Sequence, residues 1–428
     1  MLNDQFQNTL DFAKSLDERD PLQRFRKEFL VPARNGSEQI YFLGNSLGLQ
    51  SKNVKREVET ILDEWGERGV EAFIEGDNPW MDYHDQLTKP LSKIVGALPS
   101  EISVMNQLTV NLHLMMVSFY QPNAIANKIL CEAKAFPSDQ YMFETHLRNY
   151  GLNPDQIIIE VKPRQGERVI RNEDILSAIE EYRTQLALVL FSGVNYYTGQ
   201  AFDIASITRT AHNAGIIAGF DLAHAAGNIP LRLHDWDVDF ACWCSYKYLN
   251  SGPGAVGGVY VNERFHKNEN RKRFGGWWGH DKASRFKMEK GFKPIPTAEG
   301  WQLSTPSMLM YASHKAALEI FEEAGWENIQ TKRKLLNDYL WFILDEAKNA
   351  TDNKIIEFIT PRHESERGCQ VSMFMLQRGR EVFEGLTRHG VMADWREPNV
   401  IRIAPVPLYN TFEEVWKVGN ILASMLNQ

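Results

Sequence analysis

Long apolar runs and an excess of positive charge are both missing from this 428-residue sequence. No run of about 18 or more apolar residues occurs, so we expect no membrane-spanning helix. The N-terminal segment is polar and lacks the apolar core of a secretory signal peptide. Lys and Arg number 47 against 55 Asp and Glu, a formal net charge of -8. This balance disfavours a general nucleic-acid-binding protein.

Cysteine is also scarce. The four cysteines are Cys131, Cys242, Cys244 and Cys369, and no two of them are spaced as Cys-x-x-Cys. The usual zinc and redox motifs are therefore absent, and we expect no metal site. So few cysteines, without a paired pattern, fit a reduced, cytoplasmic setting.

What the sequence does contain is a regular alternation of strand-like and helix-like segments. Short apolar runs alternate with helical patterns from about residue 101 to residue 244, which indicates a largely parallel sheet covered by helices. A β-β-α-β pattern near the C-terminus indicates a compact second domain. A chain of this length can bury a substantial core and is expected to hold more than one domain.

The segment that ends at Lys247 contains the candidate catalytic residues. The run from Gly215 to Phe220 predicts a buried strand that ends at Asp221, and the apolar segment from Val238 leads to Ser245-Tyr246-Lys247. A carboxylate and a lysine at the tips of two buried strands are what a pyridoxal phosphate site requires. The acid keeps the pyridine nitrogen protonated, and the lysine forms the Schiff base. Taken singly, such an Asp is more often a cap or turn residue, and such a Lys more often lies on the surface.

Asp221-x-x-His224 followed by Ser245-Tyr246-Lys247 resembles the pyridoxal phosphate enzymes of fold type I, and further motifs resemble one family among them, the kynureninases. Those motifs are YFLGNSLG at 41–48, AKAFPSD at 133–139, GWWGH at 276–280 and RIAPVPLYN at 402–410. The similarity runs from about Tyr41 to the C-terminus. Several motifs in the same order are far more specific than any one of them.

This resemblance implies the α/β fold of fold type I pyridoxal-phosphate-dependent transferases. The large domain would hold a mainly parallel seven-stranded sheet and a smaller domain would be α+β. The resemblance places the large, cofactor-binding domain at 51–309, and the small domain at 1–50 together with 310–428. It also implies a small-molecule amino-acid substrate and a homodimer with a shared active site, with neither nucleic acid nor membrane as partner.

The resemblance also assigns the cofactor-binding residues. They are Leu108, Thr109, Phe136, Pro137, Ser138, Asp139, Ser192, Asp221, His224, Tyr246, Lys247, Trp277 and Thr305. Leu108 and Thr109 open a helix, whose free N–H groups favour a phosphate. Trp277 and Thr305 are assigned to the phosphate of the second subunit, although many relatives carry Asn in place of Thr305. Without the resemblance, Thr109 is equally explained as an N-cap.

The segment Phe136 to Asp139 has two explanations as well. A pyridine ring needs a flat apolar partner, and Phe136 can stack on it, while Asp139 can reach the ring or orient a neighbour. Alone, the same segment would be a strand-to-helix turn in which Ser138 or Asp139 caps the helix.

Arg402 lies within the last apolar strand, where an arginine is unexpected as a core residue. Its planar fork can bind a carboxylate with two hydrogen bonds. The resemblance gives it the substrate α-carboxylate and places Asn45 and His280 at the substrate too. The implied reaction is hydrolysis of L-kynurenine to anthranilate and L-alanine, or of 3-hydroxykynurenine to 3-hydroxyanthranilate, in tryptophan catabolism and NAD biosynthesis.

In that reaction the catalytic residues would be Lys247 as base at Cα, Asp221 at the ring nitrogen and Tyr246 as proton relay. Two alternatives stay open. A cysteine desulfurase or selenocysteine lyase needs a mobile cysteine late in the chain, whereas Cys369 enters an apolar strand. A non-catalytic relative would be a binding or scaffold protein, and retention of Lys247 and Asp221 together with Arg402 argues against it.

Overall fold

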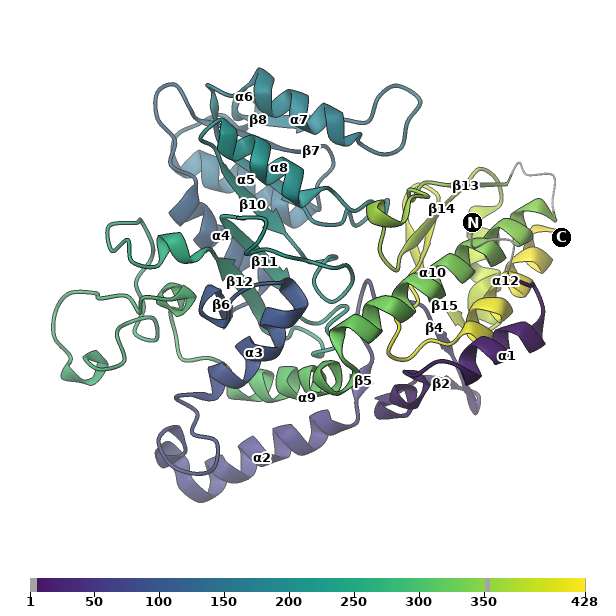
Figure 1. The fold of residues 1–428 in the computed structure, drawn as a ribbon, viewed down its shortest axis with the longest axis horizontal. Helices are drawn as coiled ribbons and strands as arrows, with labels where there is room; N and C mark the ends of the chain where they lie inside the picture. Colours follow the sequence, from purple (N-terminus) through teal and green to yellow (C-terminus); the bar gives the residue numbers. More distant parts are fainter. Residues whose placement is uncertain (1–5, 351–354, 428) are drawn as a thin grey trace.

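A seven-stranded sheet forms the centre of the larger part of the molecule (Figure 1), in a computed structural model that describes residues 6–350 and 355–427. The strand order is β6-β12-β11-β10-β9-β7-β8. The strands are β6 (Ile102–Met105), β7 (Lys128–Glu132), β8 (Ile158–Val161), β9 (Leu186–Ser192), β10 (Ile217–Asp221), β11 (Phe240–Cys244) and β12 (Gly257–Val261). Only β12 runs opposite to its neighbours in this sheet, so the expected mainly parallel α/β fold is confirmed.

Helices cover both faces of this sheet. Along β11, Ala241 and Trp243 belong to one apolar cluster, whereas Phe240 and Cys242 belong to the other. This alternation follows from the two-residue period of a strand. The covering helices are α3 (Tyr83–Val95), α4 (Leu108–Phe119), α5 (Pro137–Asn149), α6 (Pro154–Ile157), α7 (Asn172–Glu181), α8 (Ile204–Asn213) and α9 (Met308–Ala324).

A third apolar cluster surrounds a smaller antiparallel sheet on the other side of the molecule (Figure 1). Its order is β13 (Ile356–Phe358), β14 (Val371–Met375), β17 (Val400–Ile403) and β16 (Asp394–Arg396). The helices beside it are α1 (Leu10–Glu18), α10 (Trp326–Asn349), α11 (Gly379–Arg388) and α12 (Phe412–Leu426). The N-terminal segment joins this part through β4 (Ile40–Tyr41), which pairs with β15 (Val391–Met392).

The helices α9 and α10 connect the two sheets (Figure 1). The helical pattern of this region is interrupted at Gly325, whose φ of +78° is left-handed and favours glycine. Helix α2 (Asn53–Arg68) packs beside α9 and is followed by the short 3-10 helix η3 (Gly69–Phe73). Among the described helices, none is long and apolar enough to cross a membrane.

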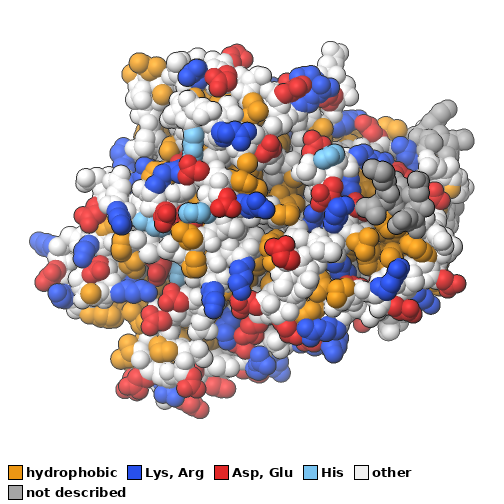
Figure 2. Space-filling view, in the orientation of Figure 1, with side chains coloured by type: hydrophobic (Ala, Val, Ile, Leu, Met, Phe, Trp, Pro, Cys, Tyr) orange, Lys and Arg blue, Asp and Glu red, His pale blue; other side chains and the backbone are white. Residues whose placement is uncertain are grey.

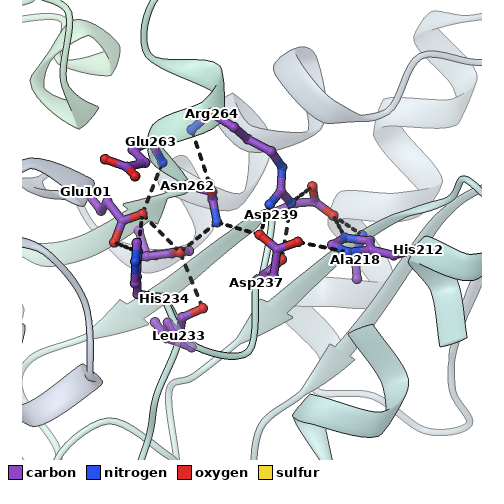
Figure 3. A network of polar contacts seen from close by, with 11 residues as sticks. Glu101, His212, Ala218, Leu233, His234, Asp237, Asp239, Asn262, Glu263 and Arg264 are labelled. Carbon is purple, nitrogen blue, oxygen red and sulfur yellow. Dashed lines mark hydrogen bonds and ion pairs between the residues drawn. The ribbon is translucent and has the colours of Figure 1, made fainter. Parts of the chain in front are cut away.

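Two buried carboxylates, Glu101 and Asp239, fix the end of the large sheet at which the parallel strands begin (Figure 3). Their partners are the backbone N–H groups of Glu263 and Ala218, at 3.0 and 2.7 Å, and the imidazoles of His234 and His212, at 3.0 and 2.8 Å. Arg264 adds an ion pair with Asp239. These contacts hold the antiparallel β12 in place, since Glu263 and Arg264 follow the strand after Asn262.

Candidate functional site

A cavity lies at the opposite end of the same sheet, beyond the carboxyl ends of β7, β9 and β10, where open α/β sheets bind their ligands. Glu132, Ser192 and Asp221 are the last residues of these three strands, and Ser192 is the direct cross-strand neighbour of Asp221. The cavity brings together these predicted residues: Leu108, Thr109, Phe136, Ser138, Asp139, Ser192, Asp221, His224, Tyr246 and Lys247.

Lys247 lies inside this cavity and only 8% of the residue is exposed. Its Nζ is 3.1 Å from Nε2 of His224 and 5.8 Å from the ring centroid of Phe136. The backbone of Lys247 is held close by the predicted turn at 44–48. A Cβ on Gly48 would lie 2.4 Å from the Lys247 carbonyl oxygen, so only glycine fits there.

Asp221 is buried at the tip of β10, and its Oδ1 accepts a hydrogen bond from the Ala223 N–H at 2.7 Å. Burial raises the pKa of Asp221, and this backbone donor and the Lys247 ammonium oppose the rise. Burial, together with the charges of Asp221 and Glu132, raises the pKa of Asp139 well above its usual range. The backbone donor and the ammonium group favour the ionised form of Asp221, which is the form that stabilises a proton on a ring nitrogen.

Glu132 also belongs to this cluster of buried carboxyl groups, but it was not predicted from the sequence as a site residue. Burial raises the pKa of its carboxyl to about 7, and both oxygens accept from the Ser192 N–H, at 3.1 and 3.2 Å. Its position at the end of a predicted strand was the available signal, because residues at such ends face the ligand.

His224 is neutral in this setting. Burial, followed by the charges of Lys247, Arg402 and Arg396, lowers its pKa well below the ordinary value. Its Nε2 is the atom facing the lysine, so in the tautomer that accepts from an ammonium group the proton sits on Nδ1.

The N-terminus of α4 offers an anion site at the edge of the cavity. Gln107 is the N-cap residue and no side chain caps the helix, while Thr109 lies in the first turn. Thr109 is therefore not the N-cap. Helix α5 likewise begins after Phe136, with Pro137 in its first turn and no cap from Ser138 or Asp139. The first N–H groups of α4 have no intrahelical acceptor and suit a phosphate.

The residues present fit pyridoxal phosphate. Three buried polar atoms, Oδ1 of Asp139, Oγ of Ser192 and Nδ1 of His224, have no hydrogen-bond partner within the described chain. All three residues line the cavity. Since buried polar groups are rarely left unpaired, these atoms indicate a ligand with polar groups on its ring as well as a phosphate.

Some predicted residues lie elsewhere in a single chain. Pro137 is outside the cavity lining, and Thr305 is exposed. Trp277 is 42% exposed and packs against Trp278 and Phe286, with ring centroids 5.8 and 5.4 Å away.

His280 is half-buried, and its Nε2 is 3.1 Å from the Ser284 hydroxyl. Like Trp277 and Thr305, it does not reach the cavity lining of one chain. The structure of one chain therefore does not bring these three residues to the cavity.

Arg402 and Asn45 lie together beside the cavity. Arg402 is 1% exposed and donates to the carbonyl oxygen of Tyr196, which lines the cavity. The same oxygen accepts from Nε2 of Gln370 at 3.0 Å, and Oε1 of Gln370 accepts from Asn45 at 2.9 Å. A network from both sheets therefore holds these two predicted substrate residues next to the cofactor cavity.

Known structures share this architecture. The apo structure of a cysteine desulfurase from Thermococcus onnurineus NA1 matches with a TM-score of 0.74 at 18% identity, covering 95% of this chain and 98% of that one. C-DES with glycine covalently linked to its pyridoxal phosphate cofactor matches with a TM-score of 0.74 at 16% identity, covering 90% and 96%. At such low identity these matches establish the fold.

Sequence comparison is more specific. A profile of the kynureninase C-terminal domain matches residues 329–422. The kynureninase of Flavobacterium psychrophilum is 52% identical over 97% of this chain and 98% of its own length, and that of Flavobacterium johnsoniae is 52% identical over the same shares. The kynureninase of Koribacter versatilis is 48% identical over 99% of both chains. The chain therefore belongs to the kynureninase family.

Proposed function

We propose that the protein is a pyridoxal-phosphate-dependent kynureninase (EC 3.7.1.3), a hydrolase that converts L-kynurenine to anthranilate and L-alanine in tryptophan catabolism. Identity of about half to curated kynureninases over nearly the whole chain carries this proposal. 3-Hydroxykynurenine is proposed as a second substrate, with a contribution to NAD biosynthesis.

Pyridoxal phosphate, when bound, supplies an electron sink that stabilises negative charge at the substrate Cα. Asp221 is proposed to hold a proton on the ring nitrogen from its buried position. Lys247 would hold the cofactor and then move a proton at Cα, next to the neutral imidazole of His224. Burial raises the pKa of Tyr246, so its phenol keeps its proton at neutral pH and can donate it.

The buried, protonated thiol of Cys369 argues against the alternative of a cysteine desulfurase. The thiol of Cys369 is 2% exposed, and the N–H of this residue is fixed by Oδ1 of Asn228 at 2.8 Å. Burial raises its pKa to about 12, so it is a thiol at neutral pH, whereas a nucleophilic cysteine must be an accessible thiolate.

The proposed function is tested by the visible spectrum of the purified holoenzyme, followed in the same cuvette by L-kynurenine with anthranilate fluorescence as readout. We expect both signals from the parent and neither from Lys247→Ala. Lys93→Ala, on an exposed face of α3, is the matched control and should keep both. A cofactor band without anthranilate would reject the substrate, and no band would reject the cofactor as well.

We also propose a homodimer. Apolar side chains are unusually exposed at the end of α2 and in η3, where Trp65 is 63% and Val70 80% exposed. The same holds at 274–292, where Phe274 and Phe286 are each 60% exposed. The end of α2 and η3 is the lower-left projection in Figure 1, and orange side chains show there in Figure 2. Elsewhere on that face both signs of charge are mixed (Figure 2). Such exposure is typical of an interface.

The division into domains at 51–309, and at 1–50 with 310–428, is likewise proposed; within it, residues 1–5, 351–354 and 428 lie outside the described chain. The cluster around the smaller sheet supports it from α10 onward, because Leu16 and Phe42 pack there with side chains of that region. Helix α9 packs with the large sheet and joins the two parts. We propose a cytoplasmic location, which four free cysteines support.

A further inference from the structure

Strand β16 places an aspartate directly opposite Arg402. In the antiparallel pair β16–β17, Asp394 and Arg402 are cross-strand partners. Side chains of directly opposed residues lie on the same face of a sheet and within contact distance. Asp394 therefore meets Arg402 through strand register rather than through a flexible loop.

The contact uses one edge of the arginine. Oδ1 of Asp394 accepts from Nε of Arg402 at 3.2 Å, and Oδ2 accepts from Nη2 at 2.7 Å. Nη1 donates to the Tyr196 carbonyl oxygen. A guanidinium has five N–H donors, of which these contacts use three. One unused N–H group remains on each terminal nitrogen. Together these two groups can donate to both oxygens of a second carboxylate.

Asp394 is itself fixed on two further sides. Oδ2 accepts from the Ser46 hydroxyl at 3.0 Å and lies 3.2 Å from Nη2 of Arg396. Two arginines therefore share one aspartate, and the group carries a net charge of about +1 when all three are ionised. That surplus matches the single negative charge of an amino-acid carboxylate.

We propose that Asp394 is a positioning residue, which turns the guanidinium of Arg402 so that its two free N–H groups receive the substrate α-carboxylate. This inference rests on the proposed function only in that the substrate is an α-amino acid. Asp394 contacts the Nε edge of Arg402 before the substrate binds, so Arg402 does not have to rotate on binding. The Asp394 carboxylate also compensates the buried positive charge of the guanidinium. Preorganisation of this kind lowers the cost of binding.

The test compares two amines that differ only in the carboxylate. L-Alanine and ethylamine are titrated into the holoenzyme, and binding is followed by the change in cofactor absorbance, so no kynurenine hydrolysis is needed. Asp394→Asn keeps the shape of the side chain but sets an amide N–H against the guanidinium. We expect it to raise the Kd of L-alanine about tenfold or more and to leave that of ethylamine unchanged, since the lost contact is a charged hydrogen bond to a residue that only the carboxylate meets.

Asp345→Asn is the matched control, because Asp345 makes a similar two-bond pair with Arg362 at an exposed site. It should change neither Kd. Asp394→Glu should restore part of the alanine affinity. If Asp394→Asn loses the cofactor, Ser46→Ala replaces it, with a smaller effect in the same direction. Equal weakening of both amines, or of neither, would overturn the proposal, even in an enzyme that hydrolyses kynurenine.

Discussion

At the scale of single residues, the contact between His212 and Asp239 makes part of the stability depend on pH. The hydrogen bond to the buried Asp239 raises the pKa of His212, and desolvation opposes this rise. A histidine with a raised native pKa binds its proton more tightly in the folded state. Its stabilisation is therefore complete below the unfolded pKa of about 6.5 and is lost as the pH rises through the native pKa.

We predict that His212→Gln lowers the free energy of unfolding by about 1 kcal/mol at about pH 6 and by less at about pH 9, since a glutamine gains no proton. Urea denaturation at the two pH values measures this difference. His363→Gln, which removes an exposed histidine bonded to Ser365, is the control. An equal loss at both pH values would assign the role of His212 to packing alone.

Individual residues also show how much of the site can be predicted from the sequence. Asp221, Ser192 and Lys247 were predicted there because each follows an apolar run, and the structure brings them into one cavity. Glu132 and Asp394 were not singled out. Their importance comes from burial at a strand end and from cross-strand register, and neither is visible in one-dimensional spacing.

At the scale of elements, β12 and β16 were missed. Strand β12 begins with two glycines, Gly257 and Gly258. Glycine is a poor strand former in isolation, and β12 is specified by pairing with β11 on one side and β6 on the other. The three residues of β16 are half-buried and show no apolar run. The break between α9 and α10 at Gly325 depends on a left-handed backbone angle, which an apolar pattern does not reveal.

We predict that Gly258→Ala destabilises the protein by about 1–3 kcal/mol, because extra atoms in a packed core force neighbours to move. A Cβ there would lie 2.1 Å from the buried indole of Trp243. Thermal unfolding measures the loss. The double variant Gly258→Ala/Trp243→Leu is the control, and its loss should be smaller than the sum of the single losses. Simple additivity would show that the close approach is not the cause.

At the scale of the whole molecule, one chain presents an incomplete set of predicted cofactor residues. Lys247 and Asp221 line the cavity, whereas Trp277 and Thr305 are exposed outside it. The overall fold class followed from the resemblance of separate motifs, but no periodicity in a sequence describes which side chains cross an interface. The proposed dimer accounts for this separation, since each cavity would be completed by its partner.

We predict complementation between two inactive variants. Lys247→Ala and Trp277→Ala lack different halves of a shared site, so a mixed dimer contains one complete site. Random reassociation after mild dissociation should restore about a quarter of the parent activity, since about half of the dimers are mixed. Anthranilate fluorescence measures the recovery. No recovery, or full activity of Trp277→Ala alone, would contradict a shared site, while Thr305→Ala in place of Trp277→Ala gives an independent repeat.

The polar network of Figure 3 and the cofactor cavity occupy opposite ends of the same strands. This separation matters for protein engineering. Substitutions that retune the pocket for other aromatic amino acids tend to lower the melting temperature, and losses of that kind can be repaired by strengthening contacts around Glu101 and Asp239 without touching the chemistry. The protein can therefore acquire new substrate specificities, because stabilising substitutions at one end of the sheet do not alter the residues of the pocket at the other end.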